Sequence, residues 1–155
     1  MDVVTDRRYQ VGLPPAELWS LLTQTHRYRT WWPWLRRFDG DGVVLDQSWC
    51  CSVQPPLSYP VRFAVLIDEV WAPFGASGSL TGDVVGTARI DITATSAGSE
   101  ARLVARLAPG NGFLRAASRL AGPLVRLGHD WVLDTAARQF MTQAVGSVAA
   151  PPTAS

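Results

Sequence analysis

The segment Leu13–Thr23 reads LPPAELWSLLT, and its order of prolines and apolar residues indicates how the chain begins to fold. Pro14 and Pro15 end the stretch before it, and a proline is well suited to the first turn of a helix. We therefore expect a helix over residues 16–23. Its apolar residues recur at helical spacing and form a stripe for burial, namely Leu18, Trp19, Leu21 and Leu22.

A strand is predicted before this helix, over Val3–Val11. Successive side chains on a strand point to opposite faces. One face of this strand is mostly polar, so the face that carries Tyr9 and Val11 is expected to point inward. After the helix, a second helical or turn segment is expected over His26–Phe38, where Pro33 interrupts it. That segment holds three of the chain's seven tryptophans, Trp31, Trp32 and Trp34.

Five further strands are expected after the turn signal DGDG at residues 39–42. Prolines and glycines separate these strands as they do in hairpin connections. The last two strands alternate between polar and apolar residues, which is typical of an antiparallel sheet with one covered face. The five expected strands are Val43–Val53, Tyr59–Trp71, Ala76–Val85, Thr87–Ala97 and Glu100–Ala108.

The last third of the chain has a helical pattern. A proline within a helix removes a hydrogen bond, so Gly122-Pro123 predicts two helices, Phe113–Ala121 and Pro123–Val145. Residues 148–155 are small and polar and are expected to form a flexible tail.

The order of elements, β-α-α-β-β-β-β-β-α, predicts an α+β chain with a single ligand-binding domain over residues 1–147. A curved antiparallel sheet of six strands, or of seven, is expected to wrap around the long C-terminal helix. The two short helices fall between the first and second strands. Glycines within the strands favour strong curvature, and a curved sheet that grips a helix encloses an apolar cavity.

Three motifs resemble a known superfamily. LPPAELWSLLT at residues 13–23 looks like the opening helix of the START/Bet v 1-like helix-grip superfamily (SRPBCC), which includes polyketide cyclase/dehydrase-like proteins. YRTWWPW at residues 28–34 is similar to the turn Y-x-x-W-W-P common in those proteins. AGP at residues 121–123, with GHDW at residues 128–131, resembles the start of their C-terminal helix. The resemblance covers Val3–Val145 and implies a helix-grip fold with a hydrophobic ligand, since members range from lipid and hormone carriers to aromatases and cyclases.

Composition and charge argue against several classes of function. The 155 residues carry a formal net charge of +1, which argues against nucleic acid or a membrane surface as a general partner. No apolar run approaches the length of about 18 residues needed to span a membrane, and the charged N-terminus lacks the apolar region of a signal peptide. We therefore expect a cytoplasmic protein, either a monomer or a homodimer. The adjacent Cys50 and Cys51 point to opposite faces of a strand and are expected to be free thiols.

The sequence contains no motif for a metal, a cofactor or a catalytic nucleophile. Its two histidines, His26 and His129, are far apart, and there is no Cys-x-x-Cys pair. Glycine-rich phosphate loops and a Gly-x-Ser-x-Gly elbow are also absent. We expect neither metal nor cofactor, and a site made of a few polar groups in an apolar pocket.

Four polar residues fall on predicted inward faces or at the start of the main helix: Tyr9, Gln47, Glu69 and His129. As catalytic residues, Glu69 or His129 would act as general acid or base, since desolvation raises a carboxyl pKa toward neutrality. Tyr9 would donate to a carbonyl or enolate oxygen of the ligand. In the alternative interpretation, Glu69 lies in solvent or pairs with an arginine, and His129 packs at the helix start. A change of strand register would move the strand residues to the other face together.

Tryptophans on the predicted inward faces indicate a moderate, aromatic-lined pocket rather than a wide lipid tunnel, because each ring fills a large volume. The residues expected to bind the ligand are Trp32, Gln47, Trp49, Phe63, Trp71, Ile90, Leu103 and Trp131.

Three functions fit these observations. The first is binding of a hydrophobic small molecule, aromatic or polyketide-like, between the sheet and the C-terminal helix. The second is acid–base catalysis in that cavity by a polyketide cyclase, aromatase or dehydratase. The third is an RNA- or membrane-interacting module that uses the basic aromatic turn, residues 26–37, with its four arginines and three tryptophans.

Overall fold

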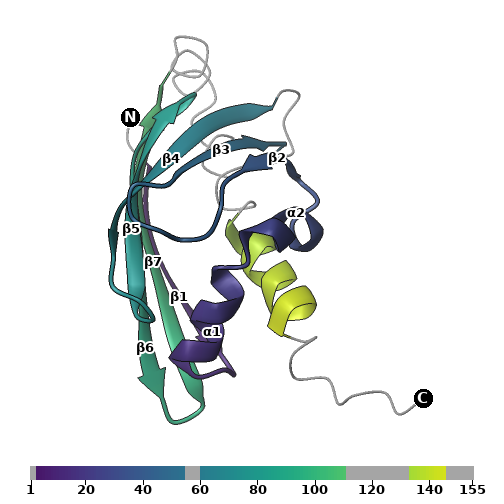
Figure 1. The fold of residues 1–155 in the computed structure, drawn as a ribbon, viewed down its shortest axis with the longest axis vertical. Coiled ribbons are helices and arrows are strands. Elements are labelled where there is room, and N and C mark those ends of the chain that lie inside the picture. The colour runs from purple at the N-terminus through teal and green to yellow at the C-terminus, as the bar shows by residue number, and fades with distance from the viewer. Residues whose placement is uncertain (1–2, 55–59, 111–132, 146–155) are drawn as a thin grey trace, which may run out of the picture.

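The computed structural model describes residues 3–54, 60–110 and 133–145 (Figure 1). The chain begins with β1 (Val3–Val11), α1 (Pro15–Leu22), the 3-10 helix η1 (Thr25–Arg27) and α2 (Tyr28–Trp31). A C-terminal helix over residues 133–145 ends in the π-helical turn η2 (Phe140–Val145). The intervening strands are β2 (Leu35–Asp39), β3 (Ser48–Val53), β4 (Val61–Val70), β5 (Gly75–Gly82), β6 (Val84–Thr95) and β7 (Gly98–Pro109).

The seven strands form one antiparallel sheet in the order β1-β7-β6-β5-β4-β3-β2. Strands that follow one another from β2 to β7 pair as neighbours, and β1 pairs with β7 at the far edge. The sheet curls, and α1, α2 and the C-terminal helix lie on its concave side (Figure 1). The expected α+β architecture, a curved sheet that grips a C-terminal helix, is therefore confirmed.

The segment His26–Phe38, expected to be helical or a turn, contains the seventh strand. Helix α2 ends at Trp31, and β2 begins four residues later at Leu35, beyond Pro33. Leu35 is buried and Phe38 packs against the core, so this short strand contributes two inward side chains. A helix prediction fails here because proline removes a helical hydrogen bond.

The strand expected from Val43 begins only at Ser48, because a turn occupies the residues before it. The amide of Gln47 donates to the carbonyl of Val44 at 3.1 Å, and Asp46 has a φ of 66°. Aspartate tolerates this left-handed conformation better than most residues. Residues 44 and 45 are exposed as a result.

Strand alternation agrees with the expected faces on β1, β6 and β7. Val11 is buried and Tyr9 half-buried on the concave side, while the alternate residues of β1 are exposed, namely Val4, Asp6, Arg8 and Gln10. Ile92 of β6 and Ala101 of β7 are buried opposite each other. The concave side of these strands is therefore largely apolar, as the sequence predicts.

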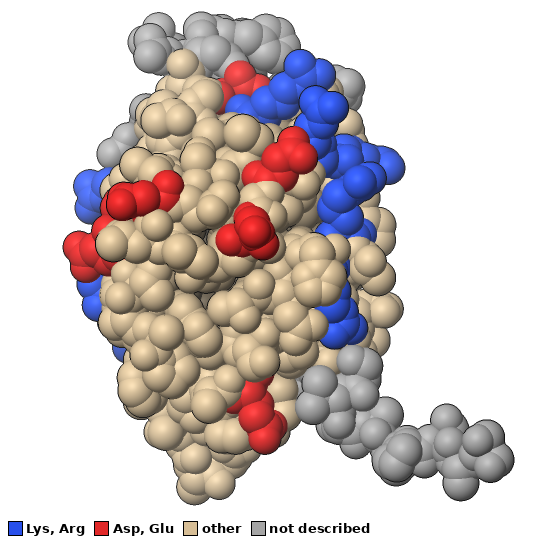
Figure 2. All heavy atoms as spheres, in the orientation of Figure 1, with Lys and Arg blue, Asp and Glu red and all other residues tan. Residues whose placement is uncertain are grey.

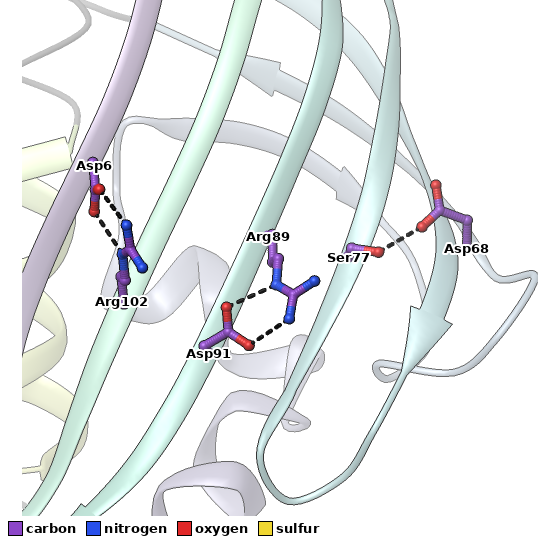
Figure 3. A network of polar contacts seen from close by, with 6 residues as sticks. All are labelled: Asp6, Asp68, Ser77, Arg89, Asp91 and Arg102. Atoms are coloured by element: carbon purple, nitrogen blue, oxygen red, sulfur yellow. Dashed lines mark hydrogen bonds and ion pairs between the residues drawn. The ribbon is translucent and has the colours of Figure 1, made fainter.

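The convex face carries a row of charged and hydroxyl side chains in a close-up of the sheet (Figure 3). These groups are largely exposed to solvent, and exposed ion pairs contribute little to stability. The convex face is therefore the hydrated side of the sheet. The contacts of the row join Arg102 to Asp6, Arg89 to Asp91, and Asp68 to Ser77 and Ser79.

The two neighbouring thiols are expected to differ in reactivity by about a hundredfold or more. Cys50 is exposed, whereas burial raises the pKa of Cys51 to about 12. Only a thiolate attacks a disulfide reagent, so an aromatic disulfide should label one thiol per folded chain quickly. Cys50→Ser should abolish the fast phase and Cys51→Ser should keep it. Two fast thiols in the folded protein would contradict the burial of Cys51.

Candidate functional site

Several large apolar side chains on the concave face are only half-buried, although the C-terminal helix lies on the same side of the sheet (Figure 1). Strand register aligns Leu103 of β7 with Ile90 of β6, and Ile90 with Ala76 of β5. On the other side, Leu103 lies opposite Arg7 of β1. The half-buried inward residues of β4, β6 and β7 include Phe63, Val65, Ile90, Leu103 and Leu107.

A neighbouring row of small residues crosses the middle of the concave face. Register places Thr5 of β1 opposite Ala105, Ala105 opposite Ala88, and Ala88 opposite Gly78. Gly78 in turn lies opposite Ile67 of β4. Small side chains make this row lower than the rows beside it, and Thr5, Ala105 and Gly78 in it are buried while Ala88 is half-buried.

Three polar side chains meet at the β1 end of the concave face. Arg7 and Tyr9 point inward from β1, and Arg7 Nη1 lies 3.7 Å from Asp134 Oδ1 on the C-terminal helix. The Tyr9 hydroxyl is buried and, within the described ranges, has no hydrogen-bond partner. Burial, and then the charge of Asp134, raise the pKa of Tyr9, so its phenol stays a neutral donor.

Glu69 is exposed on the convex side, so its expected inward position is wrong. A β-bulge between Ile67 and Glu69 sets two residues of β4 against one of β5, and this shifts the alternation. The other bulge residue, Asp68, also belongs to the convex row (Figure 3). Asp91, and more weakly Glu69, raise the pKa of Arg89. Glu69 therefore lies in solvent, as the alternative interpretation of the sequence had it, close enough for its charge to act on Arg89.

Trp71 also lies on the convex side, so its expected place in a cavity wall is wrong. The guanidinium carbon of Arg89 lies 4.5 Å from the centroid of the Trp71 ring. Arg89 belongs to the convex row (Figure 3). The bulge that turns Glu69 outward precedes Trp71, so one irregularity explains both errors.

Four other residues expected in the wall have inward positions. Trp49 on β3, Phe63 on β4 and Ile90 on β6 pack against the hydrophobic core. Leu103 faces the same side as Ile90, its partner across β6 and β7. All four side chains therefore lie on the concave side of the sheet.

The remaining expected residues lie at the margin of the sheet or outside the described ranges. Gln47 is half-buried in the turn before β3, where its carbonyl accepts from the amide of Ile67 at 2.9 Å. His129 and Trp131 fall within residues 111–132, which the structure does not describe. The described part of the expected polar set on the concave face is therefore Tyr9.

Trp32, also expected in the wall, anchors the C-terminal helix together with Trp34. Trp32 Nε1 donates to the carbonyl of Ala136 at 2.9 Å, and Trp34 Nε1 donates to Gln139 Oε1 at 2.8 Å. The Trp32 ring also stacks on Phe140, with ring centroids 6.3 Å apart. These contacts fasten α2 and the following turn to the C-terminal helix.

The basic aromatic turn does not present its indoles for stacking. Trp31 is 1% exposed, and Trp32 and Trp34 are half-buried with their N–H groups bound to the helix. Stacking of nucleic-acid bases requires exposed aromatic faces. Arg36 and Arg37 are exposed, and Figure 2 shows a basic strip along the side of the molecule where α2 and β2 lie. The geometry therefore does not favour RNA recognition by this turn.

Replacing Trp34 by phenylalanine is expected to lower the free energy of unfolding by about 1 kcal/mol, the net value of one hydrogen bond. Gln139→Leu removes the partner of the same bond and should have a similar effect. Urea denaturation of both single variants and of the double variant measures the coupling. The double variant should have a free energy of unfolding only slightly lower than that of either single variant. Fully additive losses of free energy would show that the hydrogen bond between Trp34 and Gln139 adds no stability.

Two further features concern metals and membranes. Among residues 3–54, 60–110 and 133–145, no group of three or more His, Cys, Asp and Glu side chains is placed to hold a metal ion. In the same ranges, no helix combines the length and the apolar character needed to cross a membrane.

Comparison with known proteins identifies the fold. No protein-family model and no curated protein matches the chain, whereas 193 chains of solved structures do. Protein Ms6760 from Mycobacterium smegmatis is 12% identical with a TM-score of 0.70, over 97% of this chain and 93% of that one. A putative uncharacterized protein from Rhizobium leguminosarum is 10% identical with a TM-score of 0.65, over 92% and 97%. Ara h 8.0201, a Bet v 1 allergen, is 10% identical with a TM-score of 0.60, over 90% and 95%.

At these identities the likeness shows the fold alone. That fold is the Bet v 1-like helix grip, which confirms the fold that the resemblance in the sequence implies. The narrower assignment to polyketide cyclase/dehydrase-like proteins stays a prediction.

Proposed function

We propose that the chain binds a hydrophobic small molecule, aromatic or polyketide-like, between the concave face of the sheet and the C-terminal helix. The observation that carries the proposal is that Leu103, Ile90 and Phe63 face inward yet stay half-buried. Apolar side chains on an inward face are usually buried fully, and a ligand would complete their burial. The helix-grip fold supports the proposal, since it is generally suited to hydrophobic ligands.

The shape of the concave face favours a flat ligand. Ala105, Ala88 and Gly78 give a low floor, and the larger Leu103 and Ile90 border it. Polar groups at the β1 end would fix the orientation of the ligand, as a few polar groups do in most apolar sites. We further propose that the protein acts in the cytoplasm, as a monomer or a homodimer.

Native mass spectrometry tests this function. Freshly purified protein should carry a hydrophobic co-purified molecule, or should form a one-to-one complex with added benzophenone, a two-ring aromatic ketone. A spectrum with only the unliganded mass, both before and after benzophenone is added, would overturn the proposal.

Catalysis by acid and base in the same space, by a cyclase, aromatase or dehydratase, is the second candidate function. The observation that favours it is the buried Tyr9 hydroxyl, which is available as a proton donor. With Glu69 outside, a general base has to come from elsewhere than the expected carboxyl. Exchange of the methyl protons of acetophenone in heavy water, followed by NMR, tests for such a base. Exchange no faster than in Tyr9→Phe would rule this candidate out.

A further inference from the structure

We propose that the ligand presents a neutral carbonyl oxygen, which accepts a hydrogen bond from Tyr9 beside the Arg7–Asp134 ion pair. This inference rests on the proposed function and specifies the chemistry of the ligand. It concerns the β1 end of the concave face, where the polar side chains of β1 meet the C-terminal helix.

The first argument is the state of the Tyr9 hydroxyl. Its oxygen is shielded from solvent, and nothing in the described part of the chain accepts its proton. A buried donor without an acceptor is unfavourable, whereas buried polar groups in native proteins are normally paired. An acceptor supplied by a ligand would remove this cost, so the hydroxyl is poised for an oxygen that arrives from outside the protein.

The second argument concerns the charge of that oxygen. Burial, and then the neighbouring carboxylate of Asp134, raise the pKa of Tyr9 and outweigh the lowering effect of Arg7, so the phenol is a protonated donor at neutral pH. The same carboxylate would repel an anionic oxygen placed at the Tyr9 hydroxyl. The positive charge of Arg7 is already opposed by Asp134 at 3.7 Å. Both side chains are partly exposed and their opposite charges offset each other, so the pair as a whole favours a neutral acceptor over a carboxylate.

The third argument is the continuity of this polar end with the apolar wall. Arg7 of β1 lies directly opposite Leu103 of β7. Tyr9, also in β1, lies opposite Ala101 of β7. Leu103 continues across the sheet to Ile90. A ligand whose rings lie against Leu103 and Ile90 therefore has its edge beside Tyr9. An aromatic ketone or a quinone has this combination of a flat apolar body and a carbonyl at its edge.

Matched probes test the proposal in the full-length protein. Benzophenone and diphenylmethane have nearly the same shape and differ by the carbonyl, and diphenylacetate supplies an anionic oxygen on the same skeleton. Their Kd values are measured by NMR titration for the wild type and for Tyr9→Phe, which removes only the hydroxyl. Thermal unfolding of Tyr9→Phe checks that the variant is folded, and Asp134→Asn provides a second variant that keeps the hydroxyl.

The Kd of benzophenone should rise about tenfold in Tyr9→Phe, the value of one buried hydrogen bond, while that of diphenylmethane stays within about twofold. Diphenylacetate should bind the wild type more weakly than benzophenone and should gain affinity in Asp134→Asn. Equal losses for benzophenone and diphenylmethane, or diphenylacetate as the tightest ligand, would overturn the carbonyl assignment and leave the proposed function standing. Failure of all three probes to bind would overturn both.

Discussion

Leu103→Trp is expected to raise the Kd of benzophenone by about a hundredfold, which corresponds to about 2.7 kcal/mol. Leu103 is half-buried on the concave face, between Arg7 of β1 and Ile90 of β6. An indole at this position would occupy the space that the ligand needs. Overfilling a packed apolar space commonly costs about 1–3 kcal/mol. Here that cost would appear as a weaker free energy of ligand binding. NMR titration of both proteins with benzophenone measures the change.

Val104→Trp is the matched control, because Val104 is the next residue of β7 and points to the convex face. The same side chain is introduced into the same strand, so both variants carry similar effects on strand propensity. The Kd of benzophenone should change by less than about twofold, since surface substitutions seldom affect a distant site. Equal losses in the two variants would place the ligand elsewhere, or show a general effect on the sheet.

Trp31→Ala is expected to lower the free energy of unfolding by about 3–5 kcal/mol, the usual range for removing a buried tryptophan. Trp31 is 1% exposed, and its ring centroid lies 5.5 Å from that of Phe140 on the C-terminal helix. It also contacts Tyr28 and Trp32. Small domains are stable by about 5–15 kcal/mol, so this single change removes a large part of the total. Denaturant unfolding measures it.

Trp31→Phe separates the packing of the ring from its polar group. The indole N–H of Trp31 is buried and finds no acceptor in the described part of the chain, so phenylalanine loses no hydrogen bond there. We expect a cost of about 1–2 kcal/mol, from the smaller ring alone. A cost for Trp31→Ala no larger than that for Trp31→Phe would contradict the role of Trp31 in joining α2 to the helix.

Polarity patterns predicted the regular strands well. In β1, β6 and β7 the alternation runs without interruption, so the inward positions of Tyr9, Ile90 and Leu103 followed from the sequence. Alternation fails at a bulge, because one extra residue reverses the faces after it. Neither Glu69 nor Trp71 carries a signal that marks the bulge at Ile67, and both were therefore assigned to the wrong side.

Contacts between distant segments were beyond the reach of the sequence. Trp32 and Trp34 bind residues 104 and 105 positions away, so their role as anchors depends on how the C-terminal helix docks. Nothing in the sequence distinguishes Asp134 from other polar helix residues. Its contact with Arg7 forms only when the chain is folded. Tyr9 was singled out from the sequence as an inward polar residue, whereas Arg7, which shares its face of β1, was not.

The central claim is that a ligand lies between the concave face and the C-terminal helix, and intermolecular NOEs test it most directly. Protein with labelled methyl groups is saturated with benzophenone, and contacts to its ring protons are assigned. We predict NOEs to the methyl groups of Leu103 and Ile90 on the concave face. NOEs to Val104 and Leu66 on the convex face instead, or no intermolecular NOE at saturation, would contradict the account.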